Sequence, residues 1–235
     1  MGPGDRLDRT RRAEEAIAKC QVVVGYPPYL KKIQDLIAGK ETIATGMTHE
    51  VERCRAALRR TAEGADVALI SSGDPGIYGM AGLAIELAAE DGLEVAIEVI
   101  PGVTAASAAA AKLGAPLMVD FAVISLSDRL VSWETIRARL EAAAAADFVV
   151  ALYNPRSRQR IAQHDEAVAI LRRCRPAPTR VGIATAVGTA TERIVVTDLG
   201  RLLEFDIDMQ TIVIVGNSSS RLIGKWFITA RGYRI

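Results

Sequence analysis

Residues 66–90 read DVALISSGDPGIYGMAGLAIELAAE, and the order of residue types in this stretch decides the fold class. Asp66–Ser71 is a short apolar run of the kind that forms a buried strand. A turn rich in glycine and proline follows it, and an alanine-rich helical pattern then continues to about Glu90. A strand that passes through a flexible turn into a helix begins a βαβ unit, so this stretch predicts a parallel sheet with crossover helices.

The same alternation of strand and helix runs through the first half of the chain. The pattern predicts helices over 6–19, 27–39, 49–63 and 104–114, the third behind a capping Thr48, and strands over 21–25 and 93–102. The sequence GPGD at Gly2–Asp5 is another strand-to-helix turn. Because such turns normally follow an apolar run, we expect a strand ahead of it that this sequence lacks.

The pattern changes at Leu113–Asp120, where Gly and Pro interrupt it and no helix follows. We place the domain boundary there, between residues 116 and 117. The second half has predicted helices over 133–145 and 159–173, and predicted strands over 121–126, 147–153, 180–185, 193–198 and 211–216. With more strands and fewer crossovers, this half predicts a mixed sheet. The fold class is therefore α/β, with an N-terminal domain over 1–116 and a C-terminal domain over 117–235.

The composition excludes several classes of protein. The chain has 29 Lys and Arg against 28 Asp and Glu, and this balance lacks the basic excess of a nucleic-acid-binding surface. No apolar run approaches the roughly 18 residues that span a bilayer. The charged N-terminal stretch does not fit a secretory signal. We therefore expect a cytoplasmic protein that binds neither nucleic acid nor membrane.

The cysteines and histidines show no metal-binding pattern. Cys20, Cys54 and Cys174 are scattered without CxxC spacing, so we expect small buried apolar residues rather than disulfides or metal ligands. His49 starts a predicted helix, where histidine is usually structural, and His164 lies on a helix where we expect it to be exposed. No metal site is predicted.

Three glycine loops share one design: Gly2–Asp5, Ser71–Gly79 and Ile100–Ser107. Ligands of open α/β sheets sit at the carboxyl ends of strands, and glycine allows a ligand to approach the backbone. Strand-to-helix turns also need glycine on their own account, which is the better interpretation of any single loop. The loops lack both phosphate-binding motifs, GxxxxGK[ST] and GxGxxG. Asp74 would repel a phosphate, so it favours a ligand with hydroxyls or positive charge.

These loops and several longer motifs resemble the tetrapyrrole methylases of cobalamin biosynthesis, the class III methyltransferases. The motifs cover nearly the whole chain in order: GPGD, VVVGYPPYL, MTHEVERCRAAL, VALISSGDPGIYGMAGLAIEL, VIPGVTAASAAAAKLGAPLMVDFAVISLSD, ADFVVALYNPRS and TIVIVGNSSSRLIGKWFITARGY. The resemblance implies two α/β domains with a cleft between them, a homodimer, and methylation of C17 of precorrin-3B or its cobalt-bearing counterpart with ring contraction.

The resemblance also implies S-adenosyl-L-methionine as the cofactor, folded into that cleft. Carried over by motif, its binding residues are Pro3, Ser72, Gly73, Asp74, Ile77, Thr104, Ala105, Asn154 and Gly188. The chain departs from the family pattern in two places. The strand before GPGD is absent, and ATAVGTATE (184–192) stands where this branch usually has an Asn-Ala-Gly-Arg type of loop.

Ring contraction requires proton transfers, and general acid–base assistance typically contributes about 10²–10⁴-fold. Ser127 and Asp128, in ISLSD, are the candidate catalytic residues, with helix capping as the alternative interpretation. The substrate carries many carboxylates, which the guanidinium fork of arginine matches.

The candidate substrate-binding residues are Tyr78, Arg129 and Arg156, and Arg158 lies beside them in sequence. The structural alternative is that Tyr78, like Tyr26 and Tyr153, is a packing residue and that the arginines are solvated surface.

Two alternative functions stay open on the sequence alone. One is methylation of a different ring position by another precorrin methylase of the same family. The other is a non-catalytic tetrapyrrole-binding protein that retains the fold. The sequence leaves open whether the substrate carries cobalt.

Overall fold

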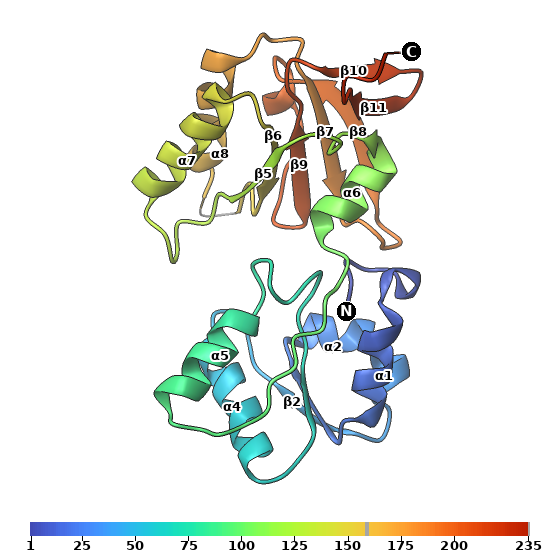
Figure 1. Ribbon diagram of the computed structural model, residues 1–235, viewed down its shortest axis with the longest axis vertical. Helices are drawn as coiled ribbons and strands as arrows, with labels where there is room; N and C mark the ends of the chain where they lie inside the picture. Colours follow the sequence, from blue (N-terminus) through green and yellow to red (C-terminus); the bar gives the residue numbers. More distant parts are fainter. Residues whose placement is uncertain (158–159, 235) are drawn as a thin grey trace. The chain divides into compact units, whose positions relative to one another are not determined.

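The chain forms two compact units, Met1–Ala105 and Ala106–Ile235 (Figure 1). The computed structural model describes residues 1–157 and 160–234, so Arg158 lies outside the described residues. The boundary falls after Ala105 rather than after Pro116, because the helix and short strand that follow Ala105 contribute to the second unit.

The first unit is built on a parallel three-stranded sheet in the order β2-β1-β3. These strands are β1 (Val22–Gly25), β2 (Glu41–Ala44) and β3 (Val67–Leu69). In the central strand, Val24 pairs with Ile43 on one side and with Leu69 on the other. The parallel βαβ pattern that the sequence predicts is confirmed.

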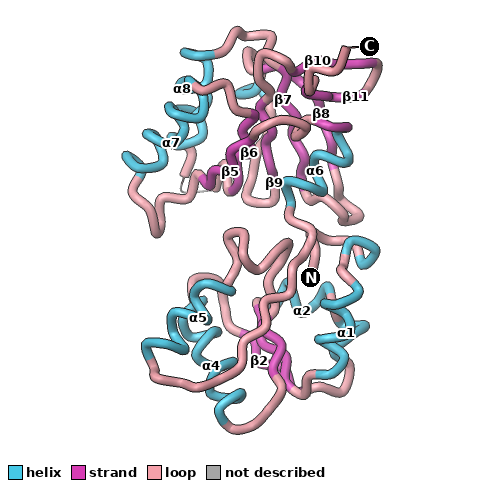
Figure 2. The backbone as a smooth tube through the Cα atoms, viewed as in Figure 1, coloured by secondary structure: helices cyan, strands magenta, loops and turns pink. Residues whose placement is uncertain are grey.

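Helices cover both faces of this sheet (Figures 1 and 2). One face packs against α1 (Arg11–Lys19), α2 (Pro27–Lys32) and α3 (Gln34–Ile37) through a cluster that contains Val23 and Ile70. The other face, with Val22 and Val24, packs against α4 (Glu50–Ala62), and α5 (Ala81–Glu90) packs beside α4. Residues alternate between the two faces along each strand, and both faces are apolar.

Several N-terminal elements differ from the prediction. The expected helix over 6–19 is a 3₁₀ turn, η1 (Arg6–Asp8), followed by α1, because the side chains of Asp5 and Thr10 each begin a separate helical segment. The expected helix after Pro27 is interrupted at Ile33 and becomes α2 and α3.

Two further predictions fail in this unit. Thr48 does not cap α4, since it has a positive φ of 69° and its hydroxyl donates to the Met47 carbonyl. His49 takes the N-cap position instead. In the described structure, no strand forms over 93–102.

The second unit contains a five-stranded sheet in the order β5-β6-β9-β7-β8. Its strands are β5 (Phe121–Ser125), β6 (Val149–Tyr153), β7 (Arg180–Thr185), β8 (Arg193–Asp198) and β9 (Thr211–Val215). β5 and β6 are parallel, whereas β9 runs antiparallel to both β6 and β7. The predicted mixed sheet is confirmed.

Helices α7 (Trp133–Ala145) and α8 (Ala162–Cys174) pack together on one face of that sheet. The opposite side of β7 meets α6 (Ala105–Leu113), where Gly182 lacks the side chain that would collide with Leu113. The remaining elements are η2 (Leu202–Glu204), β4 (Gly114–Ala115), β10 (Ser220–Ile223) and β11 (Trp226–Thr229). β4 pairs with β11, which explains why residues 106–116 belong to the second unit.

The observed burial of the cysteines and of His164 differs from two expectations. Cys54 is buried, but Cys20 is partly exposed and Cys174 is exposed. His164 is buried rather than exposed, with only 1% of its surface accessible. Among residues 1–157 and 160–234, no helix has the length and apolar character needed to cross a membrane.

Candidate functional site

The three glycine loops lie against one another in the first unit. The Gly73 N–H donates to the Gly2 carbonyl at 2.8 Å, which joins the first loop to the second. The Gly102 N–H donates to Asp74 Oδ2 at 2.9 Å, which joins the second loop to the third. Gly73 also lies close to the backbone of Thr104. The three loops therefore lie side by side in the described structure.

Close backbone packing explains part of the glycine content. A Cβ on Gly102 would collide with the Gly73 carbonyl oxygen, and a Cβ on Gly79 would collide with the backbone of Pro75. Gly2 and Gly73 adopt positive φ angles of 70° and 64°, which glycine reaches without strain. The loops therefore need glycine for their own packing, whatever ligand they bind.

Asp74 holds this arrangement with both carboxylate oxygens. Oδ1 accepts from the Gly76 N–H at 2.8 Å, and Oδ2 accepts from the Gly102 N–H. An ionised carboxylate offers about four lone-pair sites, so it can accept a ligand hydroxyl in addition to two backbone amides. The side chain is partly exposed, as such a contact requires.

Ile77 and Tyr78 are exposed at the end of the second loop. Tyr78 has a φ of 54°, in the left-handed region that bulky residues rarely occupy. Such strained residues cluster at active sites and ligand-binding loops, where the surrounding structure holds them. The loop thus presents an aromatic ring and an apolar side chain beside Asp74.

Arg53, which the sequence does not single out, holds the neighbouring loops. It is buried, and its guanidinium donates to the carbonyls of Thr45 (3.0 Å) and Gly46 (2.6 Å) after β2. It also lies 3.4 Å from the Met80 sulfur and 5.8 Å from the centre of the Tyr26 ring. One arginine therefore links the segments that follow all three parallel strands. Arg53 lies within an ordinary helical pattern, so nothing in the sequence indicates this role.

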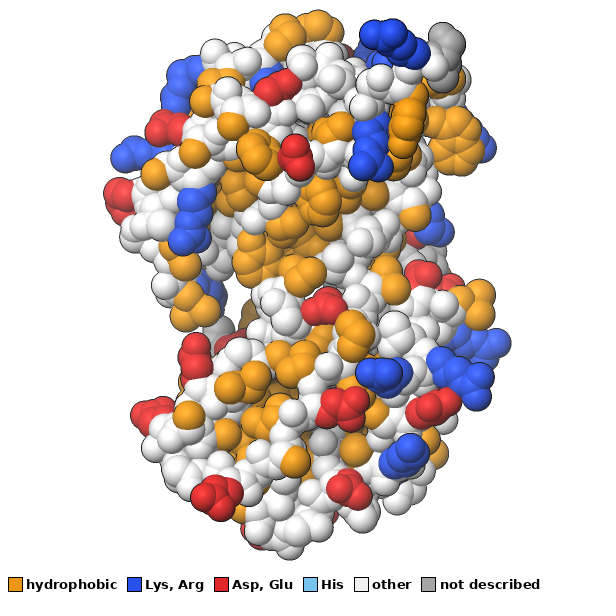
Figure 3. All heavy atoms as spheres, in the orientation of Figure 1, with side chains coloured by type: hydrophobic (Ala, Val, Ile, Leu, Met, Phe, Trp, Pro, Cys, Tyr) orange, Lys and Arg blue, Asp and Glu red, His pale blue; other side chains and the backbone are white. Residues whose placement is uncertain are grey.

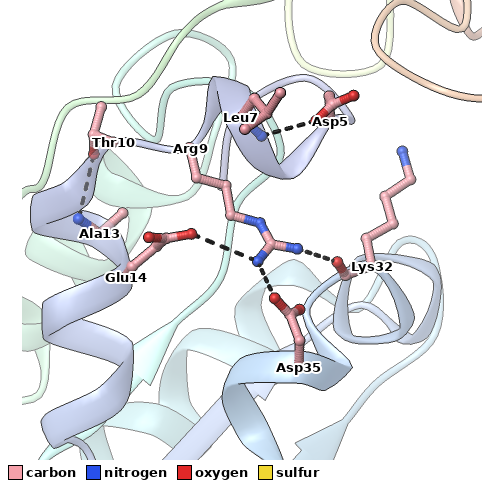
Figure 4. Close-up of polar contacts among 8 residues, drawn as sticks. All are labelled: Asp5, Leu7, Arg9, Thr10, Ala13, Glu14, Lys32 and Asp35. Carbon is pink, nitrogen blue, oxygen red and sulfur yellow. Dashed lines mark hydrogen bonds and ion pairs between the residues drawn. The ribbon is translucent and has the colours of Figure 1, made fainter.

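The start of α1 fixes the third loop from the other side. Thr10 caps α1 by accepting from the Ala13 N–H (Figure 4). The Thr10 hydroxyl also donates to the Pro101 carbonyl of the third loop at 3.2 Å.

The neighbouring Arg9 donates to Asp35 Oδ2 at 2.7 Å and to the Lys32 carbonyl at 2.6 Å, as Figure 4 shows. The Arg9 hydrogen bond lowers the pKa of Asp35 below its ordinary value. Pro3, in the first loop, directly follows Gly2 and precedes η1.

In the second unit, the candidate residues share one edge of the five-stranded sheet. β5, β6 and β7 all run in one direction, because β9 is antiparallel to both β6 and β7. Their carboxyl ends therefore lie at the same edge. The candidates that follow these ends are Ser127, Asp128 and Arg129 after β5, Asn154 and Arg156 after β6, and Gly188 after β7.

Asn154 is tied to the strand beside it. It has a φ of 48°, and its side-chain amide donates to Ser125 Oγ at 2.9 Å. The same hydroxyl oxygen accepts from the Ser127 N–H at 3.2 Å. Ser125 thus fixes both a candidate cofactor-binding residue and a candidate catalytic residue, a role that the sequence did not reveal.

Asp128 and Ser127 do not cap the following helix. The N-cap of α7 is Ser132, whose side chain accepts from the Thr135 N–H, so the capping alternative is wrong. Asp128 instead accepts from Gln163 Nε2 at 2.8 Å. Arg160 is buried nearby and donates to the Leu126 carbonyl. Burial lowers the pKa of Arg160, and the charge of Asp128 opposes that effect.

The loop at 184–192, which departs from the family pattern, follows β7 and is held by its own Glu192. The Gly188 N–H donates to Glu192 Oε2 at 2.7 Å, and Glu192 also pairs with Lys112 at 3.1 Å. Gly188 and Ala186 both have positive φ angles, 74° and 50°.

Among the other candidates, Arg156 is partly exposed and Arg129 is exposed. The Tyr153 hydroxyl accepts from the Ala106 N–H at the start of α6, which is a structural role.

Comparison with protein families identifies the chain. Residues 1–203 match the model of the tetrapyrrole (corrin/porphyrin) methylases. The chain belongs to this family.

Curated relatives of this tetrapyrrole methylase are similar along its whole length. It is 45% identical to the probable cobalt-factor III C(17)-methyltransferase of Salmonella typhimurium, over 100% of the chain and 98% of that protein. It is 46% identical to the cobalt-factor III methyltransferase of Priestia megaterium, of which it spans 44%. It is also 41% identical to the precorrin-3B C(17)-methyltransferase of a Sinorhizobium species, over 95% of the chain and 89% of that protein.

Solved structures of tetrapyrrole methylases share the fold. The crystal structure of the methyltransferase CobJ matches with a TM-score of 0.93 and 38% identity, over 97% of this chain and 96% of that one. The Thermus thermophilus uroporphyrin-III C-methyl transferase, solved with S-adenosylhomocysteine, matches with a TM-score of 0.70 over 92% of this chain and 94% of that one. At 22% identity, the second match shows the fold alone.

Proposed function

We propose that this tetrapyrrole methylase transfers a methyl group from S-adenosyl-L-methionine to C17 of precorrin-3B or its cobalt-bearing counterpart, with ring contraction, in cobalamin biosynthesis. The observation that carries the proposal is the 45% identity to the Salmonella protein across essentially the full length of both chains. The compared length spans the residues of every loop that the site uses, so the similarity goes beyond a shared fold. The 38% identity to CobJ over nearly the whole chain supports the same activity.

The loops of the first unit have the chemistry that S-adenosylmethionine requires. Its ribose hydroxyls need hydrogen-bond acceptors, its adenine needs apolar contact and amide partners, and its sulfonium favours nearby negative charge. Asp74 has remaining lone pairs and a partly exposed carboxylate, and Ile77 offers an exposed apolar side chain. We assign cofactor binding to Pro3, Ser72, Gly73, Asp74, Ile77, Thr104 and Ala105 of this unit, with Asn154 and Gly188 of the second.

Methyl transfer demands alignment more than acid–base chemistry. The bound cofactor supplies an electrophilic methyl group on a sulfonium, and displacement occurs in line with the attacking carbon. Holding the reactants in this geometry lowers the activation barrier by several kcal/mol, because their translational and rotational entropy has already been lost on binding. The hydrogen bonds that Asp74 makes to two backbone amides keep the second and third loops in one position. That rigidity supports a positioning role.

Ring contraction adds proton transfers, for which we assign Ser127 and Asp128. They follow β5 at the edge shared with Asn154, and neither is used as a helix cap. The Gln163 side chain donates to one oxygen of Asp128, and this hydrogen bond fixes the orientation of the carboxylate. Arg129 and Arg156, which follow β5 and β6 at this edge, supply guanidinium groups for substrate carboxylates, and Tyr78 supplies an aromatic contact.

The proposal extends to a homodimer, which the family resemblance implies, and to a cytoplasmic location, which the composition favours. It leaves the metal state of the substrate to experiment, because relatives named for cobalt-factor III and for precorrin-3B match at 45% and 41% identity.

The test is a mass spectrum of the tetrapyrrole after incubation with S-adenosylmethionine. Precorrin-3B and cobalt-factor III are supplied in separate reactions, and S-adenosylhomocysteine is quantified in each. We expect a gain of one methyl group and one equivalent of S-adenosylhomocysteine with one of the two substrates. A folded protein that binds S-adenosylhomocysteine but methylates neither would overturn the proposed substrate. A protein that binds tetrapyrrole and no S-adenosylhomocysteine would support the non-catalytic alternative.

A further inference from the structure

Among the residues that the structure describes, three arginines are buried: Arg53, Arg160 and Arg175. A buried guanidinium group is costly unless hydrogen-bond acceptors or negative charges surround it. On the face drawn in Figure 3, Lys and Arg side chains are scattered among acidic ones and form no single basic patch. The surroundings of the buried guanidinium groups are therefore a better guide to an anion-binding site than the surface charge of that face.

Two of the three buried arginines have acceptors within the fold. Arg53 donates to two backbone carbonyls after β2 and lies over the Tyr26 ring. Arg175, at the end of α8, donates to the backbone carbonyls of Phe148, Val215 and Gly216. These contacts account for the burial of both residues by structural roles.

Arg160, which lies between β6 and α8, has fewer acceptors. Its Nη1 donates to the Leu126 carbonyl at 3.1 Å. Its Nη2 lies 3.1 Å from the Met209 sulfur, and a thioether is only a weak acceptor. In the described part of the chain, Arg160 interacts with Asp128 through charge alone, without a hydrogen bond between the two side chains. Arg160 is therefore the buried arginine whose positive charge the fold offsets least.

The charges around Arg160 do not offset its burial. Burial lowers the pKa of Arg160, the negative charge of Asp128 opposes that effect, and the positive charge of Arg129 adds to it. The Asp128 carboxylate already accepts from the Gln163 side chain. These surroundings disfavour the positive charge of the guanidinium, and one further carboxylate would stabilise it.

The Met209 side is where a ligand can reach the guanidinium. Met209 is 44% exposed and lies just ahead of β9, whose first residue, Thr211, pairs with Thr185 at the end of β7. Met209 therefore lies at the sheet edge that holds the carboxyl ends of β5, β6 and β7. A methionine side chain is unbranched and flexible, so it can move aside for a ligand.

We propose that Arg160 is a carboxylate-binding residue, and that a ligand carboxylate displaces the Met209 thioether from Nη2. A charged carboxylate is a much stronger acceptor than a thioether, and its negative charge offsets the burial of the guanidinium. The need for a carboxylate follows from the surroundings of Arg160. The identity of the ligand rests on the proposed function, in which both the methionine portion of the cofactor and the side chains of the tetrapyrrole carry carboxylates.

Calorimetry with three probes distinguishes these two sources. S-adenosylhomocysteine carries the methionine-derived carboxylate, and methylthioadenosine is a matched nucleoside without it. Uroporphyrin III is a stable tetrapyrrole with carboxylate side chains. We expect Arg160→Met to weaken binding of one carboxylate probe by roughly tenfold or more, because a charge-assisted hydrogen bond is lost.

The probe that is affected identifies the ligand. If Arg160 binds the cofactor, Arg160→Met weakens S-adenosylhomocysteine binding but not methylthioadenosine binding. If Arg160 binds the substrate, uroporphyrin III binding weakens and both nucleosides bind as they do to the wild-type chain.

Three further variants separate ligand binding from a structural role. Arg160→Lys keeps the charge and a donor for the Leu126 carbonyl but lacks the planar fork, so it should keep the urea unfolding midpoint and lose affinity. Met209→Leu removes the sulfur and keeps the apolar bulk, so the carboxylate probe should bind at least as tightly as to the wild-type chain. Arg175→Lys, at the opposite edge of the sheet, should lower the midpoint without changing affinity.

The proposal has three outcomes that would overturn it. One is a folded Arg160→Met protein with wild-type affinity for both carboxylate probes or, where that variant does not fold, an Arg160→Lys protein with wild-type affinity. Another is a loss of affinity in Met209→Leu as large as that in Arg160→Met, since Arg160 would then act only by holding the Met209 loop. A wild-type chain that binds neither carboxylate probe would overturn the proposed function together with this site.

Discussion

Asp74 accepts a hydrogen bond from the Gly102 backbone N–H at 2.9 Å, across 28 residues of sequence. Its other carboxylate oxygen accepts from the Gly76 N–H in its own loop. The side chain is therefore both a turn residue and the link between the second and third glycine loops. A ligand that contacts Asp74 meets a carboxylate whose position is already fixed by two amides.

Replacing Asp74 by Asn tests that link. The amide side chain has one acceptor oxygen, so one of the two backbone N–H groups would face an NH₂ donor instead. We expect the free energy of unfolding to fall by about 1–3 kcal/mol, the cost of an unsatisfied polar group. We also expect weaker S-adenosylhomocysteine binding by calorimetry. Asp206→Asn, at an exposed carboxylate, is the control and should change neither quantity.

Gly102→Ala tests the close approach of the same two loops. The added Cβ would collide with the Gly73 carbonyl oxygen, which is backbone and cannot rotate away. Overpacking of this kind typically costs about 1–3 kcal/mol. Urea unfolding measures it. Gly82→Ala is the matched control: its Cβ meets nothing within 4 Å, and the site lies within α5, so stability should rise by up to about 1 kcal/mol. Equal effects of the two substitutions would contradict this account.

Ser125→Ala tests how the second unit positions Asn154. The substitution removes the acceptor for the Asn154 side chain and for the Ser127 N–H. We expect a stability loss of about 1 kcal/mol and weaker S-adenosylhomocysteine binding. The double variant with Asn154→Ala should bind little worse than Asn154→Ala alone, since residues in one network are not additive. Ser132→Ala, which removes the cap of α7, should lower stability without altering binding.

The sequence predicted the part of the site that follows from one strand-to-helix turn. Ser71–Gly79 was expected directly after a buried strand, and it does follow β3. The other two loops, Gly2–Asp5 and Ile100–Ser107, follow no strand in the described structure, and backbone groups of Gly2 and Gly102 join them to the second loop. For the second unit the sequence predicted a mixed sheet, but not the strand directions that bring Asp128, Asn154 and Gly188 to one edge.

The sequence could not predict contacts that depend on packing across the fold. Arg53 sits in an ordinary helical pattern, yet it reaches the loops after β1, β2 and β3. Ser125 lies inside a strand and acts only through its hydroxyl. The apolar run over 93–102 has the residue types of a strand, but a strand also needs a neighbour to pair with. In the described structure no strand forms there.

The buried His164 makes stability depend on pH near neutrality. Burial lowers the pKa of His164, chiefly by desolvation, while Asp165 opposes the shift and Arg156 adds to it. Its Nε2 has no hydrogen-bond partner among the described residues, so a protonated ring would bury an unpaired donor. The unfolded chain takes up a proton near pH 6.5, the ordinary value, whereas the folded chain does so only at lower pH.

The stability that neutral His164 contributes is therefore fully present above about pH 6.5. It is lost as the pH falls toward the lowered pKa of His164 in the folded chain, by at most about 1.4 kcal/mol per pH unit. Urea unfolding midpoints at pH 7.5 and 5.5 measure the loss. His164→Gln should reduce the difference between the two midpoints, because the titrating ring is gone. His49→Gln, at an exposed histidine, should retain the wild-type difference. An undiminished difference in His164→Gln would show that other groups set the pH dependence.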